Sequence, residues 1–150
     1  MTDPRDLYQE ALIDHYRRPR NCRLLEHGNR QAQGFNPLCG DKCTVYIEIE
    51  NGILKDLSFV GTGCAVSIAS ASMMTEILKG RTEAEAMAVF DSFHQLVAGT
   101  SKHPLGPVEL GELSVFAGIR GYPVRIKCAT LAWHTMRAAL ERLQETVATE

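Results

Sequence analysis

Three cysteines and one aspartate in this sequence are residues of the types that bind a soft metal ion. Cys39 and Asp41 stand two residues apart in the segment NPLCGD. Cys64 ends the segment GTGC, and Cys128 ends the segment RIKC. Three thiolates and one carboxylate suit a tetrahedral zinc ion. Because such a site has fewer than four thiolates, it is less inert than a closed structural site, and one of its thiols could leave the metal and react.

Local sequence supports the thiolate form at these positions. Cys64 and Cys128 each come directly before a predicted helix, where unpaired N–H groups and the helix dipole favour a thiolate. An extended chain would point Cys39 and Asp41 the same way, with the glycine between them allowing a close approach to an ion. The full set of ligands would leave a net charge of about −2 on a zinc ion. Arg125 and Lys127 could compensate this charge, although either could also be an ordinary surface residue.

The remaining cysteines and histidines are weaker candidates. Cys39 and Cys43 form a possible ligand pair, but Cys43 begins an alternating strand pattern, where a small buried cysteine is common. Cys22 is interpreted as a buried apolar residue. The histidines show no ligand spacing to one another, so none is expected to bind metal; they are His15, His27, His94, His103 and His134. Spacing alone is weak support for the site because its thiols lie far apart in the sequence.

The first elements that must position these residues are a helix and a hairpin. The helix begins near Pro4, with Thr2 or Asp3 as its cap, and Pro19 ends it. Residues 20–38 are polar and are expected to be mostly loop, with room for one short strand. The alternating residues 43–50 and the following 53–60 are predicted to form two antiparallel strands, because the dipeptide Asn-Gly between them is a strong hairpin signal.

Helices dominate the rest of the chain. We expect helices over 65–79, 83–98 and 129–147, a short helix at 109–117, a loop at 99–108, and an extended segment at 124–126. The first of these helices is rich in small residues, which allow close packing, and no partner pattern supports a catalytic serine there. The predicted fold class is therefore α+β, with a small antiparallel sheet (the hairpin 43–50/53–60 plus a possible third strand) packed on one face by several helices.

Bulk composition narrows the class of protein. A chain of 150 residues is expected to form a single domain, 1–150. The net charge of −2 gives no reason to expect a nucleic acid or membrane partner. No apolar run approaches the roughly 18 residues of a membrane span, and the N-terminus lacks the apolar stretch of a secretion signal, so a cytoplasmic protein is expected. In that reducing compartment, the five cysteines are expected to be thiols or metal ligands.

Several motifs together resemble one known family. The segments DHYRRPRN (14–21), NPLCGD (36–41), GTGCAVS (61–67) and RIKCATLAW (125–133) occur in the order found in the iron–sulfur cluster assembly family of IscU and SufU proteins, which is similar to the N-terminal domain of NifU. The scaffold IscU proteins carry a histidine before the last cysteine, where this chain has Lys127. Their chaperone-binding segment is replaced here by residues 121–125. With an added segment around 99–118, these departures resemble the SufU type.

The resemblance implies a function and a set of roles. SufU-type proteins are zinc-dependent sulfurtransferases that accept persulfide sulfur from a cysteine desulfurase of the SufS type, which uses pyridoxal phosphate. By resemblance, Cys39, Asp41, Cys64 and Cys128 bind zinc. Cys39 is the thiol that a desulfurase histidine displaces and that takes the sulfur. Asp41 is expected to act together with Cys39 in the reaction. Arg125 could stabilise the negative charge that develops during sulfur transfer.

Two other functions fit the same residues. The first is a scaffold on which a [2Fe–2S] cluster or iron is held by the same ligands; Lys127 in place of histidine is the feature against it. The second is a structural zinc domain without turnover. The expected partners are the cysteine desulfurase and downstream iron–sulfur scaffold proteins, with no nucleic acid and no membrane.

Overall fold

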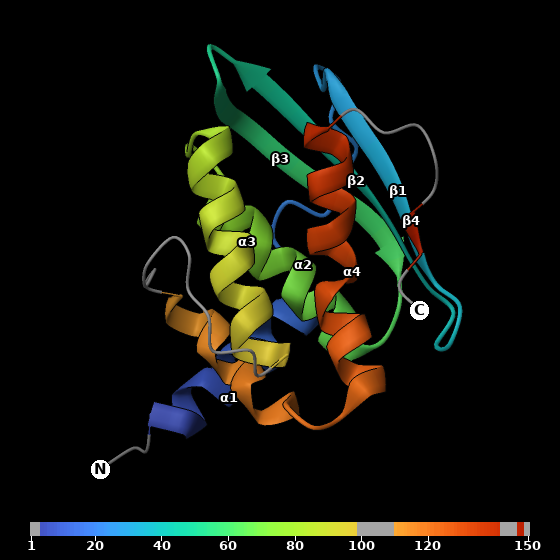
Figure 1. The fold of residues 1–150 in the computed structure, drawn as a ribbon, viewed down its shortest axis with the longest axis vertical. Coiled ribbons are helices and arrows are strands. Elements are labelled where there is room, and N and C mark those ends of the chain that lie inside the picture. The colour runs from blue at the N-terminus through green and yellow to red at the C-terminus, as the bar shows by residue number, and fades with distance from the viewer. Residues whose placement is uncertain (1–3, 99–109, 142–146, 149–150) are drawn as a thin grey trace.

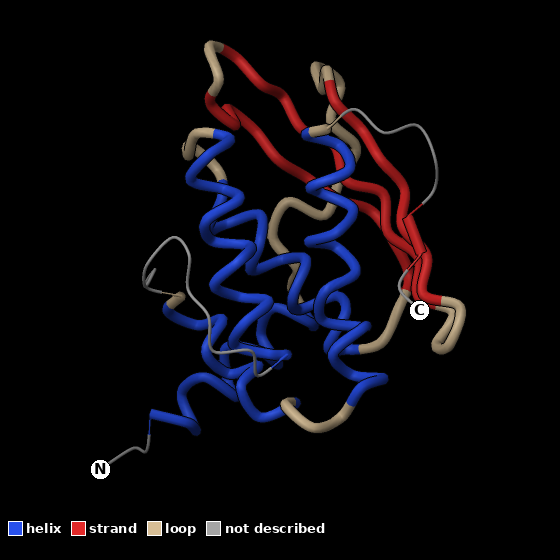
Figure 2. Tube along the Cα trace, in the orientation of Figure 1, coloured by secondary structure: helices blue, strands red, loops and turns tan. Residues whose placement is uncertain are grey.

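The structure is a computed structural model that describes residues 4–98, 110–141 and 147–148. Three long strands form a sheet, and the helices gather on one side of it (Figures 1 and 2). This arrangement confirms the predicted α+β class. In chain order the elements are α1 (Pro4–Arg17), β1 (Arg30–Asn36), β2 (Asp41–Glu50), β3 (Ile53–Thr62), α2 (Ala65–Leu78), α3 (Glu83–Ala98), the 3₁₀ helix η1 (Gly111–Ile119), α4 (Pro123–Leu140) and β4 (Val147–Ala148).

The sheet is built around the predicted hairpin. Its strand order is β3-β2-β1-β4, with β2 antiparallel to both β1 and β3. Asn51 and Gly52 have φ angles of 55° and 76°, the left-handed conformation that a tight hairpin turn requires. Alternate residues of β2, such as Val45 and Ile47, are fully buried against the helices. The short β4 pairs in parallel with β1, so the sheet is not purely antiparallel.

Strand β1 lies in the segment that we expected to be mostly loop. Its inward positions are Ala32, Gly34 and Asn36, whereas Gln31 and Gln33 are exposed. A strand is usually recognised in a sequence by large apolar side chains at alternate positions. The inner face of β1 has no large apolar side chain. Strand β1 is therefore the possible third strand of the sheet, and its position at residues 30–36 is what the sequence did not predict.

Close packing of α2 against α4 explains the small residues of α2. Ser70 Oγ donates a hydrogen bond to the carbonyl of Ala129 at 2.6 Å and accepts one from Trp133 Nε1 at 3.0 Å. Trp133 is fully buried and stacks on Phe93 with ring centroids 4.7 Å apart. The hydroxyl of Ser70 is thus used inside the core, in agreement with the structural interpretation of this helix.

Helix α4 differs most from the prediction. It begins at Pro123, and the N–H of Ile126 donates to the carbonyl of Tyr122 at 3.0 Å, so residues 124–126 are helical rather than extended. Proline at the first position of a helix loses no hydrogen bond, which explains this early start. The helix ends at Leu140, and residues 147–148 form β4, so a helix reaching residue 147 was wrong.

Two other expectations concern the segment before α4. The predicted short helix at 109–117 corresponds to η1, which is a 3₁₀ helix that buries Leu113 and Phe116 at a spacing of three residues. The predicted loop at 99–108 lies outside the described residues. In the described part of the chain, no helix has the length and apolar character needed to span a membrane.

Candidate metal centre

The turn between β1 and β2 holds Cys39 at the surface and Asp41 beneath it. Asn36 and Asp41 are paired across the two strands, and the N–H of Gly40 donates to the carbonyl of Asn36 at 2.8 Å. Gly40 has φ +75°, which glycine adopts without strain. Cys39 is exposed, whereas Asp41 is only 2% exposed. The expected extended arrangement of Cys39 and Asp41 is therefore wrong: a turn, and not a shared strand face, brings the two residues to one place.

Cys64 lies at the start of α2, as predicted, and orients Asp41. It is the N-cap residue of that helix, and its N–H donates to Asp41 Oδ1 at 3.1 Å. Cys64 Sγ lies 4.0 Å from Asp41 Oδ2. Gly63 makes this approach possible, since a Cβ at that position would lie 2.8 Å from Asp41 Oδ1. One carboxylate oxygen is thus held by the helix start, while the other faces the thiols.

Cys128 supplies a buried sulfur from α4. It lies beyond the first turn of that helix, so the prediction that it directly precedes a helix is wrong, and a helix N-terminus does not act on it. Its Sγ lies 3.4 Å from Cys39 Sγ and 3.5 Å from Asn36 Nδ2. The side chain is 3% exposed, so its sulfur forms the floor of the site beneath Cys39.

These contacts bring three of the four predicted ligands into one group. The ligand atoms of Cys39, Asp41 and Cys128 all lie within 4.8 Å of one another, a spacing that can hold a metal ion. Cys64 is outside that group and reaches it through its contact with Asp41. The donor set of soft sulfurs and one carboxylate fits zinc, and cysteines with a carboxylate can also hold an iron–sulfur cluster. We call these four residues the thiol site.

Electrostatics at the thiol site oppose negative charge unless a cation is present. Burial raises the pKa of the Cys128 thiol, and its hydrogen bonds with Asp41 and Cys39 and the negative charges of Cys64 and Asp41 raise it further. A bound dication reverses this effect because it favours the thiolate form of its ligands. Arg125 is exposed in the first turn of α4, and Lys127 is half-buried next to Cys128, so both lie on the helix that carries the buried sulfur.

The other cysteines lie outside this group. Cys43 is buried in β2, and burial raises the pKa of its thiol to about 12, as expected for an apolar cysteine. Cys22 is exposed beside the edge of β3, where it forms an isolated bridge with Phe59. Our interpretation of Cys22 as a buried residue was wrong because its polar neighbours place it on a surface loop.

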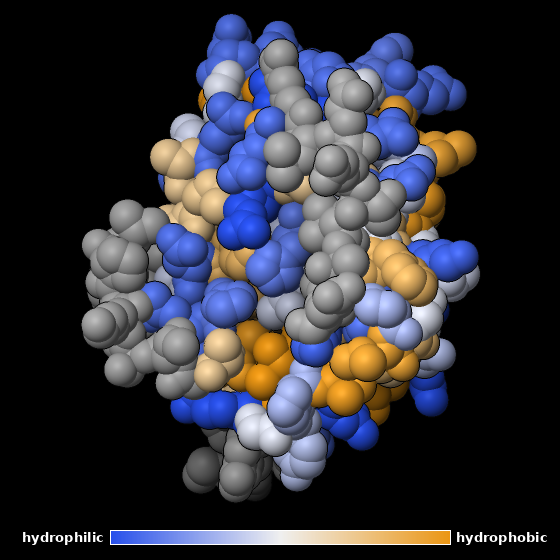
Figure 3. All heavy atoms as spheres, turned by 45° about the vertical axis from the view of Figure 1, so that its right-hand side comes forward, coloured by the Kyte–Doolittle hydropathy of each residue, from blue (hydrophilic) through white to orange (hydrophobic). Residues whose placement is uncertain are grey.

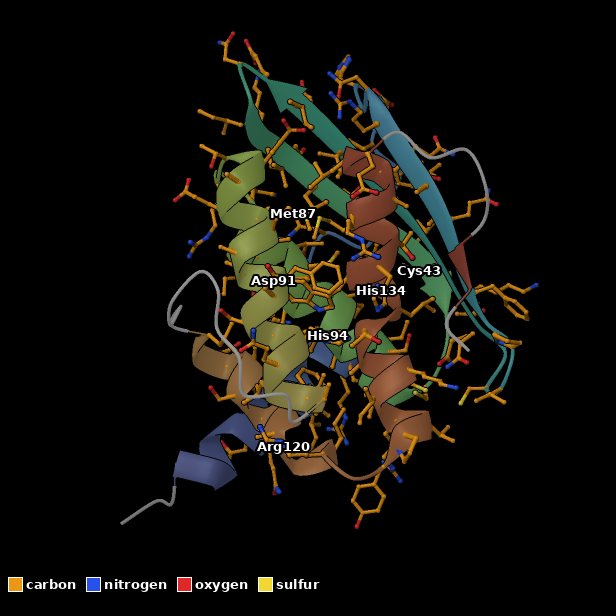
Figure 4. All side chains as sticks on the ribbon, viewed as in Figure 1. Cys43, Met87, Asp91, His94, Arg120 and His134 are labelled. Carbon is orange, nitrogen blue, oxygen red and sulfur yellow. The ribbon has the colours of Figure 1, made fainter. Side chains whose placement is uncertain are left out.

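The histidines in the described part of the chain also lie outside the group Cys39, Asp41 and Cys128. Two of them contact each other in another part of the molecule. His94 on α3 and His134 on α4 lie toward one another between the two helices (Figure 4), with ring centroids 5.9 Å apart. Burial lowers the pKa of His134 to about 4, and the positive charges of Arg137 and His94 contribute.

A second polar cluster surrounds His15, which is buried in α1. His15 Nε2 lies 2.9 Å from Glu112 Oε2 and 3.5 Å from Glu76 Oε1, and His15 Nδ1 lies 2.7 Å from Ser72 Oγ. The backbone N–H of Arg20 donates to the same Ser72 oxygen at 2.8 Å. We call His15, Ser72, Glu76 and Glu112 the His15 cluster. Sequence analysis missed it because its members come from three separate elements.

Apolar side chains border the thiol site. Leu38 is 59% exposed beside Cys39, and Tyr122 and Val124 are exposed at the start of α4. Figure 3 shows apolar surface in the lower half of the molecule, where the β1–β2 turn and the start of α4 lie in Figure 1. The exposed side of the thiol site therefore lies beside a partly apolar surface.

Sequence analysis also missed the role of Asn36. Its side chain is fully buried and contacts both Cys128 and the turn that carries Cys39. The dipeptide Asn-Pro was a usable signal, because asparagine side chains commonly hydrogen-bond to the backbone two residues further on. That rule predicts the bond from Leu38 N–H, but it could not predict a contact with Cys128, which is 92 residues away.

Comparison with known proteins gives a consistent set of relatives. Residues 7–129 match the family described as NifU-like N terminal domain. The chain is 38% identical over 136 residues to the iron–sulfur cluster assembly scaffold protein IscU of Streptococcus pyogenes serotype M1, covering 91% of this chain and 84% of that protein. It is 34% identical over 136 residues to the zinc-dependent sulfurtransferase SufU of Bacillus subtilis strain 168, covering 91% and 90%.

A solved structure agrees with these sequence relatives. The fold is similar to the crystal structure of a protein described as an iron–sulfur cluster assembly scaffold for the SUF system, from the thermophilic Fervidobacterium islandicum AW-1. The TM-score is 0.77 at 30% sequence identity, and the match covers 87% of this chain and 94% of that one.

Proposed function

The chain belongs to the IscU and SufU family of iron–sulfur cluster assembly proteins, and on this premise we propose that it is a zinc-dependent sulfurtransferase that accepts persulfide sulfur from a cysteine desulfurase. The observation that carries the proposal is the contrast between Cys39 and its neighbours. Cys39 is exposed on a turn, whereas Asp41 and Cys128 are buried beneath it. Cys39 is the exposed member of the compact group Cys39, Asp41 and Cys128, so it can react with a partner while the two buried members stay in place. Cys64 is also exposed but lies outside that group, with its backbone N–H bonded to Asp41.

Cys39, Asp41, Cys64 and Cys128 are the residues that would hold zinc in this proposal. The bound ion would keep Cys39 deprotonated while shielding it from oxidation until a partner arrives. Asp41 is held by the N–H of Cys64, so its free oxygen is oriented toward the thiols before any partner binds. Arg125, exposed in the first turn of α4, would attract the negative charge of an approaching persulfide.

The transfer itself is a thiol exchange. The Cys39 thiolate attacks the outer sulfur of the desulfurase persulfide, and a new S–S bond forms at Cys39. The S–S bond within the desulfurase breaks, and its cysteine leaves as a thiolate. The outer sulfur and its proton move together to Cys39, so no external oxidant or reductant is needed.

Alanine production by a cysteine desulfurase tests this function directly. Catalytic amounts of the zinc-loaded protein with a reductant should stimulate alanine release, and zinc-stripped protein should not. Cys39→Ala should abolish the stimulation, even if some zinc is retained by the other three ligands. Cys22→Ala is the matched control because Cys22 is also an exposed thiol but lies outside the thiol site. Stimulation that survives Cys39→Ala would overturn the proposed role of Cys39.

A second candidate function is supported by the Streptococcus pyogenes relative, which is named as a scaffold protein. In this case the thiol site would hold iron or a [2Fe–2S] cluster rather than zinc. Anaerobic loading with iron and sulfide distinguishes the two functions. A cluster that forms and transfers to an acceptor protein, with no stimulation of the desulfurase by the zinc form, would favour the scaffold.

A further inference from the structure

Asn36 is a buried amide that contacts both parts of the thiol site. It ends β1, is fully inaccessible to solvent, and pairs across the sheet with Asp41. Its Oδ1 accepts the N–H of Leu38 at 3.2 Å, and its backbone carbonyl accepts the N–H of Gly40 at 2.8 Å. These two bonds shape the turn that carries Cys39. A buried amide is costly unless its groups are partnered, so its placement here requires specific contacts.

The amide nitrogen of Asn36 points the other way, toward α4. Asn36 Nδ2 lies 3.5 Å from Cys128 Sγ, within the range of an N–H···S hydrogen bond. Because Oδ1 already accepts the Leu38 N–H, the amide can only be oriented with its NH₂ group toward the sulfur. A single side chain therefore fixes the turn with one end and the buried sulfur with the other.

The two neighbouring sulfurs consequently differ. Their Sγ atoms are only 3.4 Å apart, yet Cys128 receives the Asn36 N–H. Within the described part of the chain, no N–H group donates a hydrogen bond to Cys39 Sγ. A hydrogen bond to a thiolate disperses its negative charge, which weakens it as a nucleophile and stabilises it as a metal ligand. Cys39 receives no such hydrogen bond, and of these two neighbouring sulfurs it is the exposed one.

Resting on the sulfurtransferase function proposed above, we propose that Asn36 is a positioning residue that decides which thiol reacts. Its N–H group holds Cys128 as the ligand that stays, and its carbonyl groups hold Cys39 at the surface as the ligand that leaves. Without that N–H group, the two sulfurs become more alike. Sulfur transfer then loses its preference for Cys39.

Two substitutions of Asn36 distinguish its contact with the Leu38 N–H from its contact with the Cys128 sulfur. Asn36→Asp keeps the size of the side chain and the acceptor for Leu38 N–H, but replaces the donor facing Cys128 by an anion. Asn36→Ser keeps a shorter acceptor and removes the amide NH₂ group that reaches Cys128, without adding charge. Gln31→Glu is the matched control because it makes the same amide-to-acid change on an exposed position of β1. Circular dichroism and thermal unfolding establish that each variant is folded; if Asn36→Asp is not, Asn36→Ser carries the test.

Metal affinity and alkylation provide readouts that do not depend on sulfur transfer. Competition with a chromophoric chelator should show zinc binding weakened about tenfold or more in Asn36→Asp, the usual effect of losing a partner of a metal ligand. Limiting iodoacetamide on the zinc-loaded protein, followed by mass spectrometry, gives the ratio of Cys39 to Cys128 modification. Asn36→Ser should lower this ratio about tenfold, the scale of one hydrogen bond to a charged group.

Each outcome bears on the proposal. An unchanged affinity in Asn36→Asp together with an unchanged modification ratio in Asn36→Ser would overturn it. Equal effects in Gln31→Glu would also overturn it, since they would show a general response to charge or to strand substitution. If the wild-type protein fails to stimulate a desulfurase, the sulfurtransferase function is rejected, but the affinity and the modification ratio still test the contact of Asn36 with Cys128.

Discussion

The thiol site and the His15 cluster both join polar side chains from distant parts of the chain, but they differ in how completely these side chains are partnered. In the His15 cluster both ring nitrogens of His15 have partners, and the Ser72 oxygen also accepts the Arg20 N–H. In the thiol site, Asp41 and two sulfurs crowd together, and the described N–H donors come from Cys64 and Asn36.

Residue types alone would have suggested that the His15 cluster, rather than the thiol site, is the reactive one. A serine, a histidine and a carboxylate in contact resemble a hydrolytic triad, yet Ser72 is fully buried and its oxygen is occupied. It therefore has no access to a substrate. The thiol site brings several acidic groups close together and exposes two thiols, Cys39 and Cys64. The comparison teaches that crowded acidic groups together with exposure, rather than residue types alone, distinguish the candidate functional cluster from the structural one.

Replacing His15 tests the structural half of this comparison and has the largest expected effect. His15→Ala removes a buried ring and leaves Ser72 and Glu112 without their partner, so the free energy of unfolding should fall by about 2–4 kcal/mol. Chemical denaturation of the metal-free protein measures this change. Ile13→Ala, at an exposed position of α1, should cost about 0.5 kcal/mol or less. Similar losses in the two variants would remove the distinction between the clusters.

Crowding Asp41 tests the functional half. Gly63→Ala places a Cβ 2.8 Å from Asp41 Oδ1 and 3.1 Å from Ser67 Oγ, so the carboxylate must shift. Zinc affinity should fall about tenfold because the ligand loses its orientation. Chelator competition measures the affinity. Gly118→Ala is the control, since a Cβ there meets nothing within 4 Å. Wild-type affinity in Gly63→Ala would mean that Asp41 does not bind the metal.

Removing the exposed charge of Arg125 should have a smaller effect. Arg125→Ala is expected to slow sulfur transfer about three- to tenfold while zinc content stays normal, because a solvent-exposed charge is partly screened. The rate difference between variant and wild type should shrink at high salt. Arg17→Ala, at an exposed position of α1, controls for a general loss of charge. An unchanged transfer rate at low salt would remove the role proposed for Arg125.

His134 provides the smallest effect. It contrasts with His15 because it packs against the aromatic rings of Phe90 and His94, whereas His15 contacts carboxylates. The pKa of His134 is lowered to about 4, below the ordinary value for histidine. Between about pH 6.5 and pH 4 the unfolded chain therefore binds a proton that the folded protein excludes, and stability falls as the pH falls. His134→Asn should make this slope shallower, by less than about 1.4 kcal/mol per pH unit.

The slope is measured by denaturant unfolding at about pH 7 and about pH 5, the range in which the two states differ in bound protons. His27→Asn is the control because it makes the same substitution at an exposed position in a loop. A slope in His134→Asn equal to that of the wild type would show that His134 is protonated alike in both states.

Local signals predicted the parts of the fold whose side chains follow a simple period. The β2–β3 hairpin was predictable because Val45 and Ile47 alternate with polar residues before Asn51-Gly52. Strand β1 was not, because its inner face consists of Ala32, Gly34 and Asn36. The early start of α4 was missed since Val124 and Ile126 favour strands, and packing with Pro123 in the first position overrides that preference.

The candidate site could be predicted as residue types but not as a geometry. Soft donors and their order along the chain indicated Cys39, Asp41, Cys64 and Cys128. The sequence could not show that Cys39 is exposed and Cys128 is buried, because this depends on how the β1–β2 turn docks on α4. It also could not show the contact between Asn36 and Cys128, which forms only in the tertiary structure.

The single tryptophan of this chain gives the molecule an internal optical reporter. Trp133 is enclosed in the core, where its indole N–H bonds to Ser70 and its ring stacks on Phe93. Fluorescence excited at this indole should therefore respond to separation of α2, α3 and α4. A rearrangement confined to the β1–β2 turn should leave the emission unchanged. Chemistry at the surface thiol and loosening of the core can thus be followed separately in one sample.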